Sequence, residues 1–192
     1  MQKIRMKMKR ILLLWFTLVF LTTISYQVEA QTFGAPEAMK GKVVVGGNGD
    51  IGIAGNCFYV GVSPQAGYRL TRSLEVGARL GYALNYYWNY YGNQFYHFFS
   101  GALYANYEIF HGIYVQVEDE ETCCLIRGTD LGGITPEWYN SVFVGGGFRQ
   151  YYNATSFVYY SLMYNLSWDY SFNGGSPYAN PFVIRVGFCK GL

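Results

Sequence analysis

The sequence predicts an all-β fold, an eight-stranded antiparallel up-and-down transmembrane β-barrel. Three observations predict it: long stretches of alternating apolar and polar residues, a low content of charge, and connections that alternate between short and long. Charged residues make up 14% of the 192-residue chain and aromatic residues 20%, whereas soluble domains carry about 25% charge. This composition excludes intrinsic disorder, and a net charge of +2 is too small to indicate nucleic-acid binding.

Residues 1–30 have the features of a signal peptide that is removed on export. A basic stretch precedes an apolar run at residues 11–24, and small residues at Val28 and Ala30 suit a cleavage site. The apolar run is shorter than the ~20 residues of a membrane-spanning helix. The leader holds five of the 14 Lys and Arg and one of the 12 Asp and Glu, so the mature chain has a net charge of −2.

Alternation after residue 41 predicts the strands. Between residues 57 and 70, for example, even positions are apolar while odd positions carry Gly61, Ser63, Gln65 and Arg69. Stretches of this length suit a tilted crossing of a bilayer, which takes ~9–11 residues. The predicted strands span residues 42–53, 57–70, 73–87, 95–108, 112–121, 138–150, 155–167 and 180–188. We therefore expect an N-terminal periplasmic segment at 31–41, a barrel at 42–188 and a short C-terminal tail at 189–192.

The connections separate the two ends of the predicted barrel. Those near residues 69–73, 109–112 and 151–155 are short, and those at 88–94, 122–137 and 169–179 are longer, although the first, near 54–56, is also short. Short periplasmic turns and longer extracellular loops are typical of outer-membrane barrels. An even number of strands then places both termini on the periplasmic side.

A soluble β-sandwich or lipocalin-like barrel is the rival interpretation, and the placement of polar residues argues against it. The polar faces of the strands are crowded with Gly, Ser, Asn and Ala, which suit a narrow lumen better than a water-exposed surface. A few long charged side chains stand among them. Because an unpaired charge in a lumen is costly, we expect a paired network that consists of Glu75, Arg79, Glu118, Glu120, Arg149 and Arg185.

Three segments together resemble small bacterial outer-membrane β-barrel proteins of the OmpA/OmpX type. They are Ser63–Thr71 with the following Leu74–Gly77, Ser141–Gln150, and Asn180–Phe188. The resemblance implies an eight-stranded barrel and no enzyme activity. It also implies a C-terminal aromatic residue that is read by the outer-membrane assembly machinery. Phe188 fits this role, although Cys189–Leu192 follow it.

Motifs for catalysis or cofactor binding are weak. Gly47–Gly52 matches G-x-G-x-x-G, but the motif requires a following helix, and the sequence predicts a strand there, so we expect no cofactor. His97 and Ser100 are three residues apart on one strand, which places them on opposite faces. We therefore expect no catalysis.

Other residues leave alternatives open. Cys57 and the Cys123–Cys124 pair fall at the loop end, where a disulfide between Cys57 and Cys123 is possible, while Cys189 is expected to be a free thiol. The acidic run Glu118–Glu121 is either a cation site or a solvated strand end. We expect aromatic residues near both strand ends to form two membrane girdles. At the short-turn end, the lower girdle, they are Tyr68, Phe110, Tyr151, Tyr152 and Phe188. A carbohydrate or ligand platform on loop 88–94 is the alternative for the aromatic residues there.

The predicted function is structural or interactive: a monomeric barrel in outer-membrane lipid that presents loops to an extracellular ligand. The alternative is a narrow channel for ions or small solutes. A lipid-modifying outer-membrane enzyme is a third hypothesis.

Overall fold

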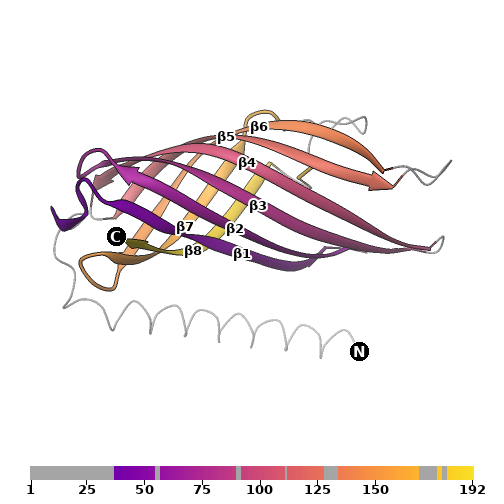
Figure 1. Ribbon diagram of the computed structural model, residues 1–192, viewed down its shortest axis with the longest axis horizontal. Helices are drawn as coiled ribbons and strands as arrows, with labels where there is room; N and C mark the ends of the chain where they lie inside the picture. The colour runs from indigo at the N-terminus through magenta and orange to yellow at the C-terminus, as the bar shows by residue number, and fades with distance from the viewer. Residues whose placement is uncertain are drawn as a thin grey trace, which may run out of the picture. The chain divides into compact units, whose positions relative to one another are not determined.

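The structure is a computed structural model that describes residues 37–54, 57–89, 92–110, 112–127, 134–168, 177–178 and 181–192. It shows a closed barrel in which each strand pairs antiparallel with its sequence neighbours and the last strand pairs with the first (Figure 1). The predicted fold class is confirmed. A short 3₁₀ turn, η1 (Glu37–Met39), precedes the strands β1 (Val43–Ala54), β2 (Cys57–Arg69), β3 (Leu74–Asn89), β4 (Gly92–Phe110), β5 (Ile113–Arg127), β6 (Ile134–Tyr151), β7 (Ser156–Asn165) and β8 (Phe182–Gly191).

The predicted signal peptide lies outside the described residues. Within the part of the chain that the structure describes, no helix is long and apolar enough to cross a membrane.

The pairing register makes the strands oblique to the barrel axis. Successive partners around the barrel are Val43, Tyr68, Val76, Ala105, Val117, Val144, Tyr164 and Phe182. In the β1–β8 register Asn48 lies opposite Gly187. Phe182 is therefore level with Ile53, which is ten residues along β1 from the starting residue Val43. A stagger of this kind accompanies strand tilts of about 35–45°, and an eight-stranded barrel has an interior just wide enough for side chains.

Side chains alternate between the interior and the outer surface as predicted. The apolar side chains of Leu103 and Ile184 point outward and are 70% and 72% exposed, whereas Arg69 and Glu75 point inward and are 0% and 1% exposed. A soluble barrel would bury its apolar face. The reversed arrangement, apolar outside and polar inside, is that of a transmembrane barrel.

Several strands extend further than their alternation predicts. The predicted loops shrink accordingly: β3 and β4 pair as far as Asn89 and Gly92, and β5 and β6 as far as Arg127 and Ile134. The described residues within 88–94 and 122–137 are therefore strand. The expected tail at 189–192 is also corrected, because β8 continues to Gly191 and pairs there with β1 and β7. In these stretches both faces carry aromatic or polar residues, so alternation no longer marks the strand.

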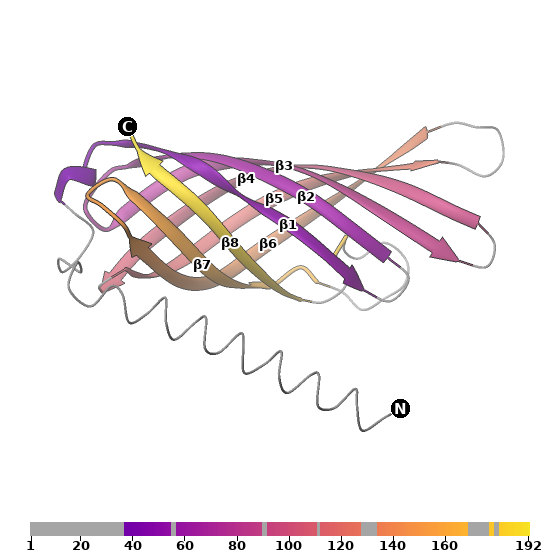
Figure 2. The same cartoon turned by 90° about the horizontal axis from the view of Figure 1, so that it is seen from below.

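η1 and the C-terminus lie at the same end of the barrel, at the left in Figure 2, which we call the lower end; the opposite end is the upper end. A cluster of buried apolar side chains lies near the lower end. Met39, from the expected N-terminal segment, is completely buried against a small group of inward-facing side chains. They include Val44, Tyr114, Phe157 and Cys189. Buried side chains thus fill the interior near the lower end.

Candidate functional site

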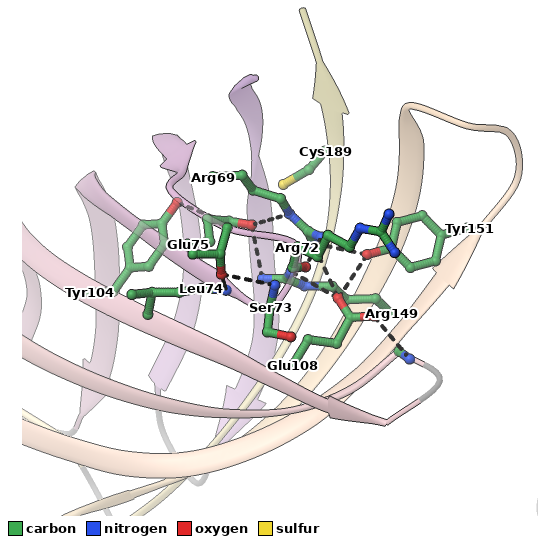
Figure 3. A network of polar contacts seen from close by, with 12 residues as sticks. Arg69, Arg72, Ser73, Leu74, Glu75, Tyr104, Glu108, Arg149, Tyr151 and Cys189 are labelled. Atoms are coloured by element: carbon green, nitrogen blue, oxygen red, sulfur yellow. Dashed lines mark hydrogen bonds and ion pairs between the residues drawn. The ribbon is translucent and has the colours of Figure 1, made fainter. Parts of the chain in front are cut away.

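Two Arg and two Glu side chains form the lower ion-pair ring, which we define as Arg69, Glu75, Glu108 and Arg149. They come from four strands, β2, β3, β4 and β6, and all four are buried. Arg69 Nε lies 3.3 Å from Glu75 Oε2, and Arg69 Nη2 lies 3.3 Å from Glu108 Oε2. Arg149 contacts the same two oxygens, at 3.1 Å and 3.6 Å. Each carboxylate is therefore shared by both guanidinium groups, and the ring is neutral (Figure 3).

Neighbouring groups hold the lower ring in place. Arg69 Nη2 donates a hydrogen bond to the Tyr151 hydroxyl at 2.9 Å, which in turn donates to Glu108 Oε2 at 3.0 Å. The backbone N–H of Gly112 donates to the other Glu108 oxygen at 3.2 Å. The Arg149 guanidinium also lies over the Tyr114 ring, 4.7 Å from its centroid. These contacts fix the ring across the lumen and not along one wall.

An equivalent set, the upper ion-pair ring, consists of Arg79, Glu118, Glu120 and Arg185 from β3, β5 and β8. Arg79 Nη2 contacts Glu118 Oε1 and lies 3.0 Å from Glu120 Oε2. Arg185 Nη1 lies 2.9 Å from Glu118 Oε2, and its Nη2 lies 4.0 Å from Glu120 Oε2. The alternation of two cations and two anions is repeated, and this ring is also neutral.

A residue from the β7–β8 connection covers the upper ring. The Tyr178 hydroxyl donates to Glu120 Oε1, and its ring packs edge-on against Phe143 at a centroid distance of 5.3 Å. Phe143 itself lies under the Arg185 guanidinium, 5.0 Å from ring centroid to Cζ. The upper ring is therefore capped by aromatic side chains.

Between the two rings lies a small cavity of about 10 Å³. Arg149 bounds it from the lower ring, and Arg79 and Arg185 bound it from the upper ring. Four buried polar atoms of its lining residues have no hydrogen-bond partner among the described residues: Asn106 Oδ1, Arg149 Nε, Arg149 Nη1 and Ser161 Oγ. A cavity of this size holds about one water molecule, which would supply those partners.

The structure brings the six predicted lumen charges together but divides them between the two rings. Glu75 and Arg149 belong to the lower ring, and the other four form the upper ring. Sequence reasoning missed Arg69 and Glu108 as members of the network. Both stand on the polar face of their strands, so the alternation itself was a usable signal. Tyr151, expected in the lower aromatic girdle, instead turns its hydroxyl into the lumen.

The disulfide considered possible between Cys57 and Cys123 is absent from the structure, in which Cys123, Cys124 and Cys189 are free thiols. Cys57 begins β2 and Cys123 lies on β5, with two strands between them. Three inter-strand steps of about 4.8 Å exceed the ~7 Å limit on the Cα separation of a disulfide.

The strand alternation places the members of the acidic run Glu118–Glu121 on opposite faces of β5. Glu118 and Glu120 face the lumen, while Asp119 and Glu121 point outward, where the Asn140 amide donates to both at 2.9 Å. Among the described residues, no group of three or more His, Cys, Asp or Glu side chains is placed to hold a metal ion. His97 faces outward and contacts the Tyr82 hydroxyl through Nδ1 at 3.0 Å.

Comparison with known proteins agrees with this geometry. No family model matches the chain, and no curated protein is similar to it. Among solved structures, the chain is similar to the N-terminal β-barrel domain of Pseudomonas aeruginosa OprF, with 16% identity and a TM-score of 0.52. The alignment covers 80% of this chain and 98% of the OprF domain. The fold is an eight-stranded barrel of the OmpA/OmpX type.

Proposed function

We propose that this barrel resides in the bacterial outer membrane and that its lumen is closed. The barrel serves as a structural anchor, and it presents the strand ends and loops of its upper end outside the cell. The observation that carries the proposal is the pair of complete, neutral ion-pair rings across the lumen. Separating a buried pair leaves uncompensated charge and costs about 3–5 kcal/mol. The likeness to the OprF barrel domain supports the membrane location at the level of the fold.

The outer surface supports contact with lipid. Its exposed side chains are mainly aliphatic and aromatic along all eight strands, as expected where hydrocarbon replaces water. Tyr68 and Phe188, predicted for the lower aromatic girdle, are outward-facing and about half exposed. The role of Phe188 as an assembly signal stays a prediction, which the insertion rate of a Phe188→Ala chain would test.

Surface labelling of cells that express the full chain tests the location and the orientation. An epitope inserted between β5 and β6, within residues 128–133, is expected to bind antibody on intact cells. The same epitope after Leu192, at the lower end, is expected to bind only after permeabilisation. Labelling of neither epitope on intact cells, or of both, contradicts the proposal.

A narrow channel for ions or small solutes is the alternative, and it requires both rings to open together. A lipid-modifying enzyme finds no support in the His97 and Ser100 pair, since His97 is directed outward and Ser100 belongs to the inward-facing set of β4.

A further inference from the structure

The β3–β4 hairpin is longer than a membrane crossing requires. β3 has 16 residues and β4 has 19, whereas a tilted crossing takes ~9–11. The two strands pair with each other up to Asn89 and Gly92, while the pairing of β4 with β5 stops at His97. A crossing of ~11 residues that starts at the lower end of each strand, at Leu74 on β3 and at Phe110 on β4, ends near Leu84 and near Ser100. The remainder of the hairpin extends past the end of β1, away from the C-terminus (Figure 1).

A continuous column of rings covers the outward face of this projection. We call it the aromatic column and define it as Tyr82, Tyr86, Trp88, Phe95, His97 and Phe99. The Tyr82 and Phe99 rings are 5.1 Å apart, Tyr86 and Phe95 are 4.8 Å apart, and Tyr86 and Trp88 are 6.0 Å apart, all between centroids. The Tyr82 hydroxyl contacts His97 Nδ1 at 3.0 Å, and His97, paired with Leu84, stands between Phe99 and Phe95 on the outward face of β4.

A membrane girdle accounts for only the lower part of the column. Aromatic girdles lie at the edge of the hydrocarbon, and Tyr82 and Phe99 stand at that level. Tyr86, Trp88 and Phe95 lie above it, yet Trp88 is 38% exposed and Phe95 is 56% exposed. A contiguous exposed aromatic surface outside the hydrocarbon marks an interaction site.

The absence of charged side chains from the β3–β4 projection narrows the class of ligand that the aromatic column can bind. No Asp, Glu, Lys or Arg occurs between Arg79 and Glu108. Recognition of phosphate or of a charged peptide depends on such side chains, so the column is unsuited to either. Sugar rings present C–H faces that pack on aromatic rings, and hydroxyl groups that pair with the hydroxyl of Tyr86 and the indole N–H of Trp88.

We propose that the aromatic column binds uncharged sugar units of a glycolipid in the surrounding outer leaflet. The inference rests on the proposed membrane location. The column continues upward from the lipid-facing surface, with the apolar Leu84 between Tyr82 and Tyr86, and faces away from the barrel axis. Its ligand is therefore one that is anchored beside the barrel, with acyl chains against the apolar band and sugars level with Tyr86, Trp88 and Phe95.

The test uses the folded full chain in neutral detergent micelles, titrated with rough lipopolysaccharide whose outer core carries uncharged hexoses, or with lipid A, which lacks them. Thermophoresis gives the apparent Kd for each. We expect rough lipopolysaccharide to bind more tightly than lipid A, and free core oligosaccharide to compete. Removing two rings, in a Tyr86→Ala/Phe95→Ala chain, is expected to weaken binding of rough lipopolysaccharide about tenfold, since each ring contact contributes a factor of a few.

The matched control is Tyr107→Ala/Phe110→Ala, which removes two outward rings at the lower end of the barrel and is expected to leave the affinity unchanged. Circular dichroism and heat-dependent gel migration verify folding. If the upper variant does not fold, competition by free oligosaccharide against the wild-type chain decides the matter alone. Equal binding of lipid A, absence of competition, or equal losses in both variants would overturn the inference. A wild-type chain that fails to enter lipid vesicles contradicts the proposed function instead.

Discussion

Replacing Glu118 with Gln is expected to lower the free energy of unfolding of the barrel by about 3–5 kcal/mol. Glu118 contacts both Arg79 and Arg185 and accepts a hydrogen bond from Gln116 at 2.8 Å. Without its charge, Arg185 keeps the Glu120 carboxylate, at 4.0 Å, as its ion-pair partner among the described residues. The two guanidinium groups of the upper ring then share one carboxylate of that ring, which leaves uncompensated positive charge in the ring.

Urea unfolding of the chain folded into lipid vesicles measures this effect. Glu121→Gln is the matched control, because Glu121 lies on the same strand but is exposed on the outer face. We expect the control to change stability by less than about 1 kcal/mol. Equal effects of the two substitutions would show that the ring does not stabilise the fold.

Adding a single methyl group at Gly147 is expected to destabilise the barrel by about 3 kcal/mol or more, or to prevent folding. Gly147 lies on β6 opposite Ser161 of β7. A Cβ atom there would overlap the carbonyl oxygen of Tyr160 and approach Ser161 Cα to 2.9 Å. Both are backbone atoms, so relief requires the two strands to separate.

Gly101→Ala is the control for this prediction, since a Cβ atom at Gly101 meets no other atom within 4 Å. Folding yield in vesicles and the urea midpoint report both variants. We expect Gly101→Ala to remain within about 0.5 kcal/mol of the wild-type stability. A stable, fully folded Gly147→Ala chain would contradict the close strand approach.

The fold was predictable because the alternation assigns each residue to one of the two faces of a strand. The polarity of each face then indicates whether it contacts lipid or the lumen. The polar set that contains Gln65 and Glu75 had to face a lumen once the opposite set was too apolar for water. Strand ends were less predictable, because Tyr86, Tyr87 and Trp88 follow one another without alternation.

Partners within the lumen were only partly predictable. Alternation shows that Glu75 and Glu118 face inward, but it does not show how far each lies along the axis. That depends on the stagger between strands, which determines that Glu75 meets Arg149 while Glu118 meets Arg185. The same stagger and the intervening strands separate Cys57 from Cys123, which sequence position alone placed at one end.

Single-channel recording in a planar bilayer tests most directly the central claim that two ion-pair rings close the lumen. The wild-type chain, inserted at low density and held at moderate voltage, is expected to show no conductance steps. A chain in which Glu75, Arg79, Glu118 and Arg149 are all replaced by Ala keeps the outer surface and is expected to conduct if it inserts. Regular open-channel steps from the wild-type chain would contradict the account and favour the narrow-channel alternative.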